Sequence, residues 1–546
     1  MKKMFSTALV TVLVACIIFS SCSRDTGLDK SFVFPIDSDP VCLDPQIAQG
    51  NAAEIVINNT FEGLVILNEN GEITQGVAVN WSISGDGLTY TFELRQNAQW
   101  NLKKSHSDIL GEDYKDSFNT KVTAHDFVFA FRRTLNPTTK SKNASLLYNV
   151  KNAKMVHQGD IEVSALGVKA INDTKLEICL ENKSTDFLYT LITPACMPCN
   201  EEFFNATKGK YGIDVKYILC NGPFYVSRWA QDSSLFIKRN DSYSGNSVVF
   251  PSSVSFMVNE NRVAAVENIL QGSYSASPVL QEYASTLLKN DKITVTEHKN
   301  TVWGFAFNCQ SPEFQNMNIR LALCHAIDSS AIDVPETHYK AKGIVPECCT
   351  VGDLNFRDTT DNVKFVECNE NKAKDFMAKG LEQLEDDSVD AVLLCSPEHE
   401  QLMRKLLQKW QEVFGLSMNV SIEVLEISNL KSRVKGLDYE LAFYPVTAND
   451  SLTANFLKSF TSHNPNNVFG YGSQIYDSLL DKIPTVSNLL QAAQGCAQAE
   501  AHLIQNGVMY PVFSQSSYFA LAQGVSGIYP HPEGNNVSFI KAMRKD

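Results

Sequence analysis

Apolar residues recur with two different spacings along the chain from about residue 30 onward. Thr89–Leu94 and residues 419–424 alternate polar and apolar side chains, which predicts half-buried strands. Residues 400–414 place apolar side chains at helical spacing and predict an amphipathic helix. Residues 302–307 and 391–394 are short continuous apolar runs, which indicate buried strands. Strands that alternate with helices predict a lobe of α/β class.

Capping and turn residues mark where several elements begin and end. Thr123, followed by Asp126 three positions later, has the pattern of a helix N-terminus, and the Asn-Pro pair at 136–137 ends the helix that it starts. An Asn-Gly pair at 221–222 predicts a turn into a strand with a hairpin partner close behind it. The polar stretch 101–121 predicts a surface loop.

The N-terminus has the pattern of an export signal. Two lysines precede residues 4–20, which carry no charge, and polar residues follow Cys22. This order is typical of a signal peptide, here residues 1–22, although the apolar run is also close to the length of a single membrane-spanning anchor. The segment before Cys16 matches a lipobox more closely, but apolar residues follow Cys16, which is a poor start for a tether. We therefore expect lipidation at Cys22, with Cys16 as the alternative, and membrane attachment by the lipid alone.

Composition and charge exclude several classes of protein. The chain has 546 residues, of which 44% are hydrophobic and 20% charged, as in ordinary globular proteins. Disordered, fibrous and polytopic membrane proteins are thereby excluded. The formal net charge of −14 provides no general electrostatic surface for nucleic acid, so no nucleic-acid partner is expected.

Sequence patterns of catalytic and metal sites are missing. There is no phosphate-binding glycine loop, no G-x-S-x-G and no H-E-x-x-H, so we expect a binding protein without cofactor or metal rather than an enzyme. Glu398-His399-Glu400 is interpreted as a solvated helix start. Twelve cysteines follow Cys22, and the pair Cys196 and Cys199 indicates either a structural bridge or buried thiols in preference to a redox motif.

Several stretches in a fixed order resemble the extracytoplasmic solute-binding proteins of family 5, the oligopeptide- and dipeptide-binding proteins of peptide ABC transporters. The resemblance extends over nearly all of residues 30–546. The stretches are Leu43-Asp44-Pro45, Phe61-Glu62-Gly63-Leu64-Val65, Asn70-Gly71, Gly76-Val77-Ala78 with Trp81, Thr89 to Arg95, Ala98-Gln99-Trp100, Val122 to Phe129, Asn221-Gly222-Pro223-Phe224-Tyr225 and Asn318 to Leu323.

The resemblance implies an α/β fold of the two-lobed, clam-shell periplasmic-binding-protein type, with an extra domain on the first lobe. An extended peptide would lie in the cleft between the lobes, paired through its backbone with strands of both, and hinge closure would follow. The expected division is 1–22 signal peptide, 23–70 with 190–300 and 515–546 as lobe I, 71–189 as the extra domain, and 301–514 as lobe III.

The resemblance also implies which residues line the cleft. In oligopeptide-binding members an acidic residue pairs with the ligand's α-ammonium, and Thr447 aligns with it, with Asp450 three positions on. Either Asp450 is the anchor in a shifted loop, or hydroxyl and carbonyl groups hold the amine. Trp303 lies on the strand that crosses between the lobes, where it either contacts the ligand or belongs to the core between the lobes. The expected ligand-binding residues are Gln49, Gly50, Asn51, Trp303, His399, Tyr444, Thr447, Asn449 and Asp450.

These observations together predict an exported, lipid-anchored and monomeric subunit of an ABC importer. Its partners would be peptides and the membrane permease. One alternative is a solute-binding protein for another ligand, namely a murein peptide, nickel, haem or a sugar. Another is an exported hydrolase or adhesin on the same fold; a hydrolase would need a Ser or Cys hydrogen-bonded to a His in the cleft.

Overall fold

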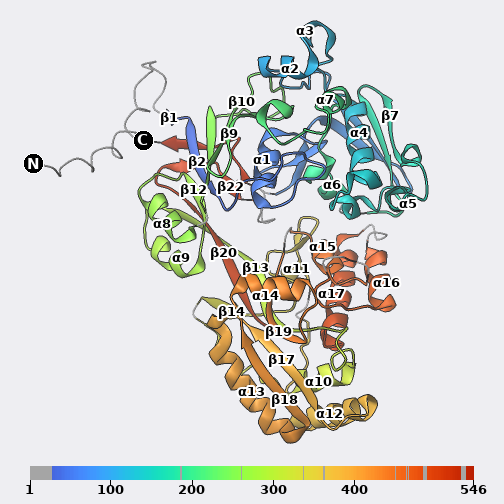
Figure 1. The fold of residues 1–546 in the computed structure, drawn as a ribbon, viewed down its shortest axis with the longest axis vertical. Coiled ribbons are helices and arrows are strands. Elements are labelled where there is room, and N and C mark those ends of the chain that lie inside the picture. Colours follow the sequence, from blue (N-terminus) through green and yellow to red (C-terminus); the bar gives the residue numbers. More distant parts are fainter. Residues whose placement is uncertain are drawn as a thin grey trace, which may run out of the picture.

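The structure is a computed structural model, which describes residues 28–545 except 70, 113, 185–186, 260, 336, 361–362, 449–450, 463, 465–466, 484–487 and 531–536. Figure 1 shows two bodies joined by the long strands β13 (Thr294–Phe307) and β20 (Met509–Leu521). We call residues 28–293 and 522–545 the first body, and residues 308–508 the second body. The predicted leader, with Cys16 and Cys22, lies outside the described residues.

A four-stranded sheet forms the centre of the first body. Its order is β2-β11-β10-β9; β2 and β11 are parallel, and the other neighbours are antiparallel. Phe32 and Phe34 on alternate positions of β2 are buried in the core, as the strand period of two requires. The strands are β2 (Ser31–Ile36), β9 (Phe224–Ala230), β10 (Ser234–Arg239) and β11 (Ser253–Val258), and helix α1 (Asn51–Thr60) contacts β9.

A second, antiparallel sheet of four strands shares the core of the first body. Its order is β5-β6-β8-β7, and its elements are β5 (Ala78–Ile83), β6 (Thr89–Leu94), β7 (Val168–Asn172), β8 (Lys175–Cys179) and the helices α4 (Ala124–Leu135) and α5 (Ala153–Gln158). At the start of α4 the Asp126 carboxylate accepts a hydrogen bond from the backbone N–H of Thr123 at 2.7 Å, which confirms the predicted N-terminus.

The described residues of 101–121 lie mostly at the surface, as expected, but the segment is partly helical and not a loop throughout. This segment contains the short helices α2 (Ser107–Leu110) and α3 (Tyr114–Ser117). His106 is buried against the ring of Phe203, with centroids 5.2 Å apart, and burial lowers the His106 pKa to about 4. The segment is polar overall, but these contacts attach it to the first body.

Strands β13 and β20 run side by side through both bodies. They pair antiparallel from Thr294, opposite Leu521, to Ala306, opposite Met509. The register shifts between His298 and Thr301, where the chain passes from one body to the other, and again between Trp303 and Gly304. Such an irregularity in a strand pair bends the strands locally. Strand β12 (Ala276–Val279) pairs with the end of β20 in the first body.

The second body is a sheet with helices on both faces. Strands β17 (Val389–Cys395), β18 (Met418–Val424) and β19 (Leu441–Thr447) extend the sheet that contains β13 and β20. One face packs on α10 (Met317–His325), α12 (Glu370–Leu384) and α13 (Glu400–Phe414). The other face packs on α14 (Ile427–Lys435), α15 (Thr453–Lys458), α16 (Gln474–Lys482) and α17 (Leu489–Gln505).

Most of the elements that the hydrophobic pattern predicts are present. The helix expected at 400–414 has those bounds, and the strands expected at 302–307, 391–394 and 419–424 lie within β13, β17 and β18. Within the described part of the chain, no helix combines the length and apolarity that crossing a bilayer requires.

Candidate functional site

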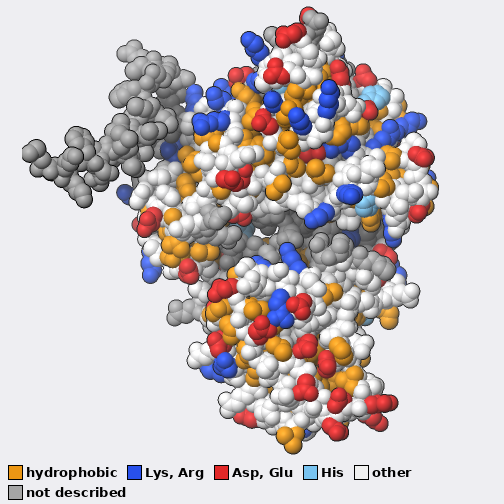
Figure 2. Space-filling model, in the orientation of Figure 1, with side chains coloured by type: hydrophobic (Ala, Val, Ile, Leu, Met, Phe, Trp, Pro, Cys, Tyr) orange, Lys and Arg blue, Asp and Glu red, His pale blue; other side chains and the backbone are white. Residues whose placement is uncertain are grey.

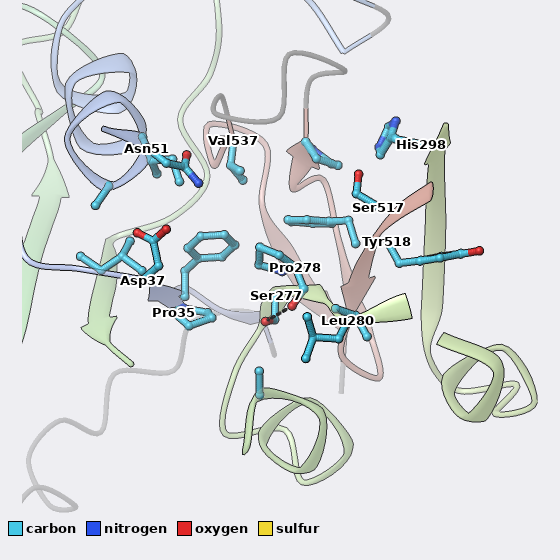
Figure 3. Close-up of a pocket in the computed structure, with 18 of the residues that line it drawn as sticks. Pro35, Asp37, Asn51, Ser277, Pro278, Leu280, His298, Ser517, Tyr518 and Val537 are labelled. Carbon is cyan, nitrogen blue, oxygen red and sulfur yellow. Dashed lines mark hydrogen bonds between the residues drawn. The ribbon is translucent and has the colours of Figure 1, made fainter. Parts of the chain in front are cut away.

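A cavity of about 500 Å³ lies where the two bodies meet, and both of them line it. Figure 2 shows the surface hollowed at this level, and Figure 3 shows the lining residues. The volume is typical of a small-molecule site. Its walls come from the ends of β2, β12 and β19, the first turn of α1, the crossing region of β13 and β20, and Lys431 in α14.

The end of β2 presents a free strand edge to the cavity. Among the strands of the described residues, β2 has β11 as its one neighbour in its sheet. The backbone carbonyl of Ile36 faces β11, where it accepts a hydrogen bond from Asn259, whereas Val33 exchanges hydrogen bonds with Ser275 on the opposite edge. Because backbone groups alternate along a strand, the Pro35 carbonyl faces the same edge as Val33. Beyond Ser275 this edge borders the cavity.

The crossing strands contribute a polar wall. His298, Ser517 and Tyr518 line the cavity and appear together at one side of it in Figure 3. Behind them Glu297 accepts hydrogen bonds from the hydroxyls of Ser516 at 2.6 Å and of Tyr339 at 2.7 Å. Burial by itself would raise the Glu297 pKa, but these two hydroxyls lower it below its ordinary value. The carboxylate thus links both crossing strands to the second body.

The second body contributes the end of β19. Thr447 and Ala448 line the cavity, and the Ala448 N–H donates to the carbonyl of Asn300 at 2.9 Å. The Thr447 hydroxyl lies 3.0 Å from the hydroxyl of Thr301, its register partner on β13. These contacts fix the β19 end against the strand that connects the two bodies.

Two of the residues predicted from the sequence meet at this cavity from opposite bodies, Asn51 and Thr447. Gln49 and Gly50 are exposed just before α1 and are not among the described residues that line it. Asn449 and Asp450 follow Ala448 directly, but they lie outside the described residues.

Three other predicted residues belong to the core of the second body. Trp303 is buried and donates from Nε1 to the Gln515 side chain at 2.6 Å. His399 is 4% exposed, with its ring centroid 4.3 Å from that of Trp303 and 5.0 Å from that of Phe443. Tyr444 is buried in the core on the opposite face of the sheet. None of the three is among the described residues that line the cavity.

The interpretation of His399 as part of a solvated helix start is wrong. Pro397–His399 forms a short 3-10 turn before α13, and the imidazole turns inward into the aromatic cluster instead of outward. Desolvation, together with the neighbouring His338, lowers the His399 pKa to about 4, so the ring is neutral at pH 7.

Several lining residues carried no sequence signal of their own. They are separated by up to several hundred positions: Asp37 directly follows β2, and Ser277, His298 and Tyr518 lie in three different strands. A polar residue directly after a buried strand, as Asp37 follows β2, is a weak indication of a site. Only the pairing of the strands shows that these positions share one cavity.

Two buried polar atoms in the cavity lining have no partner among the described residues. They are Oδ1 of Asn51 and Nε2 of His298. Burial lowers the His298 pKa, which leaves a neutral imidazole that can accept or donate one hydrogen bond at Nε2. Buried polar atoms without partners are costly, so a polar ligand or water is needed to satisfy them.

The described residues that line the cavity include no nucleophile and base pair of the kind that a hydrolase needs. The hydroxyl of Ser396 lies 2.8 Å from Nδ1 of His399, but both residues are buried in the second body, away from the cavity. Around the cavity, no described serine or cysteine hydrogen-bonds to His298. The described residues also contain no group of three or more His, Cys, Asp or Glu side chains that could hold a metal ion.

Cys196 and Cys199, the pair with the spacing of a redox motif, are unbridged and buried. No disulfide joins any of the twelve cysteines in the described part of the chain. Cys196 and Cys199 are buried thiols, and desolvation raises the pKa of each to about 12. Because the thiolate is the reactive form, these thiols are inert at neutral pH.

Comparisons with known proteins agree with this arrangement. The family described as bacterial extracellular solute-binding proteins, family 5 Middle, matches residues 72–468. The dipeptide-binding protein DppE of Bacillus subtilis (strain 168) is 26% identical over 516 residues, which cover 93% of this chain and 91% of the relative. The oligopeptide-binding protein OppA of the same strain is 24% identical over 554 residues, 97% of each chain.

The fold is also that of solved binding proteins. Listeria monocytogenes OppA bound to peptide has a TM-score of 0.72 at 19% sequence identity, covering 95% of this chain and 99% of that one. The pheromone receptor PrgZ has a TM-score of 0.73 at 22% identity, covering 95% and 100%. These likenesses confirm the predicted α/β solute-binding-protein fold.

Proposed function

The chain belongs to family 5 of the bacterial extracellular solute-binding proteins, which bind solutes and are not enzymes, and on that premise we propose that it captures peptides for an ABC importer. The resemblance seen in the sequence is thereby confirmed. The observation that supports peptide capture most directly is the cavity between the two bodies, lined by a free strand edge on one side and a strand end on the other.

Backbone hydrogen bonds supply most of the proposed affinity. The free edge of β2 at Pro35 and the end of β19 at Thr447 face the cavity from the two bodies. A peptide in extended conformation adds to such edges through its own N–H and C=O groups, whatever its side chains. The dipeptide- and oligopeptide-binding relatives and the peptide-bound OppA support this choice of ligand.

Closure of the bodies around the peptide follows from the crossing strands. The chain passes between the two bodies in β13 and β20 (Figure 1), and their register shifts where they pass the cavity. A short irregular segment of this kind can absorb a hinge rotation. In the proposed division, residues 23–70, 190–300 and 515–546 form lobe I, 71–189 the extra domain and 301–514 lobe III.

The proposed cellular role is delivery to a membrane permease from a lipid anchor. The leader sequence, with Cys22 as the acceptor and Cys16 as the alternative, supports export and lipidation of a monomer. Mass spectrometry of the membrane-extracted protein tests this, because lipidation at Cys22 leaves a modified N-terminal cysteine that Cys22→Ser lacks. Modification at Cys16 would refute the choice of Cys22.

Native mass spectrometry of the purified protein tests peptide capture. We expect peptides bound to the wild-type protein and none bound to the Ser517→Trp variant. Ser517 is exposed to the cavity, and a tryptophan at this position fills it. Ser526→Trp in β21 (Val525–Ser526) is the control, since Ser526 is exposed but does not line the cavity. A wild-type protein that binds no peptide, or equal binding by Ser517→Trp, would contradict the proposal.

A further inference from the structure

Both ends of the described chain lie together at one edge of the first body. Strand β1 (Leu28–Asp29) pairs with β24 (Met543–Lys545), and Figure 1 shows β1 beside the C-terminus. The expected lipid acceptor, Cys22, precedes Leu28 by six positions, which span at most about 22 Å when the chain is fully extended. A lipid on Cys22 therefore keeps this edge of the first body close to the bilayer surface.

The loop between β10 and β11 exposes two apolar side chains at the same edge. Val248 is 70% exposed and Phe250 is 42% exposed. The Phe250 N–H donates to the carbonyl of Ile540 at 3.0 Å, and the Ser252 N–H donates to the carbonyl of Lys30 at 2.7 Å. These backbone hydrogen bonds hold the loop between the residues that follow β1 and the residues that precede β24.

Lysines lie on both segments that hold this loop. Lys30 directly follows β1, and Lys541 and Lys545 are exposed in the C-terminal segment. Lys541 forms an ion pair with Glu69 at 2.9 Å, but the pair lies at the surface, where phosphate groups can compete for the lysine. Exposed apolar side chains next to lysines are typical of surfaces that bind membranes. We call this set of residues the tether-side patch: Lys30, Val248, Phe250, Lys541 and Lys545.

The negative charge of the chain is concentrated in the body that does not carry this patch. The second body has 27 Asp and Glu residues against 16 Lys and Arg, whereas the first body has 31 against 27. Figure 2 shows acidic side chains gathered at the end of the second body that lies away from the first. An anionic surface repels the second body much more than the first, so it favours an orientation with the first body toward the lipid.

We propose that the tether-side patch lies on an anionic phospholipid bilayer; this inference rests on the proposed lipid anchor. Val248 and Phe250 enter the region between headgroups and acyl chains, and the lysines lie among the phosphate groups. The anchor holds the patch at a high local concentration, so a contact too weak to attach the protein by itself is still formed.

This contact adds a protein surface to an attachment that the sequence assigns to the lipid alone. It also orients the chain. The first body rests on the bilayer, while the acidic second body is repelled from it and is free to move against the first. The cavity between the bodies is thereby held away from the lipid.

The test uses the lipidated chain in protein-free vesicles of phosphatidylcholine and phosphatidylglycerol. Val248→Trp places an indole in the tether-side patch, and brominated phospholipids quench indole fluorescence only where the ring reaches the lipid. Leu416→Trp is the matched control, because Leu416 is 95% exposed in the second body, in the turn Gly415–Ser417. The fluorescence of each variant is compared with that of the wild type, which has five tryptophans. Thermal melting verifies that each variant is folded.

On vesicles, the added fluorescence of Val248→Trp is expected to shift to shorter wavelength and to be lost when the lipids are brominated. Leu416→Trp should show neither change. Phosphatidylcholine alone, or high salt, should reduce the quenching, because the negative charge that attracts the lysines is then absent or screened. Adding Lys545→Glu to Val248→Trp should reduce it in the same way.

Three results would overturn this membrane contact. The first is equal quenching of the two variants, or quenching of neither. The second is quenching that appears only when the permease is added, which would assign the patch to a protein partner. The third is undiminished quenching on phosphatidylcholine alone. In each of these the lipid on Cys22 is present, whereas mass spectrometry that finds no lipid there would overturn the proposed anchor itself, and the contact with it.

Discussion

Replacing Arg133 by methionine should destabilise the first body, because Arg133 holds the segment that leads to the cavity. Its guanidinium is nearly buried and donates to the Asp44 carboxylate at 2.6 and 3.2 Å, and to the Gln46 side chain at 2.7 Å. Asp44 and Gln46 start the segment that ends at Asn51. Arg133→Met leaves the buried Asp44 charge without its ion-pair partner, which costs about 3–5 kcal/mol.

The expected loss is measurable by differential scanning calorimetry. A cost of that size lowers the melting temperature of the first body by about 6–20 °C. Adding Asp44→Asn to Arg133→Met should restore part of the stability, because no unpaired charge then remains buried. Arg239→Met is the matched control, since Arg239 pairs with Asp241 on the surface, and such pairs contribute at most about 1 kcal/mol.

Two outcomes would refute this reasoning about Arg133. One is a shift no larger than that of Arg239→Met, which would mean that the buried pair contributes no more than a surface pair. The other is a double variant less stable than Arg133→Met, which would mean that the Asp44 charge is not the source of the cost.

Three further predictions concern the second body and the strand β13 that leads into it. Burial lowers the pKa values of His338 and His399 to about 4. The stability that their neutral rings contribute is therefore complete above about pH 6.5 and is lost as the pH falls toward 4. Melting temperatures that do not change between pH 7 and 5 would contradict this. Gly304→Ala in β13 should lower the melting temperature, because a Cβ there would lie 2.3 Å from the Tyr510 carbonyl oxygen, and an unchanged melting curve would refute it. Cys368, the exposed cysteine among those described, should react first with a thiol reagent in the native protein, and Cys368→Ser should remove that fast phase.

Local elements could be predicted from the sequence because their causes are local. The apolar period of α13 and the alternation in β18 gave correct bounds to within a residue, and the Asp126 cap marks the start of α4. The short helices of residues 101–121 were not predicted, because composition alone does not show that His106 finds a buried place against Phe203.

The candidate site could be predicted only in part, through the family resemblance. Asn51 and Thr447 line the cavity, but Trp303 and His399 are buried in a core of the second body. The aromatic character of Trp303 suits a ligand contact and a core position equally well. Which of these it adopts depends on the packing of β13 against β19 and α13, which no local pattern contains.

The amino-acid sequence by itself determined the order of helices and strands, the expected leader and the family, since period, capping and motif order are properties of neighbouring residues. The tertiary structure alone decided which side chains meet in the cavity. Asp37 and Tyr518 are far apart in the chain and come together because β2, β12 and β20 lie next to one another at the crossing between the bodies. Long-range strand pairing of this kind depends on the whole fold, so the set of side chains that line the cavity follows from it and not from any one segment.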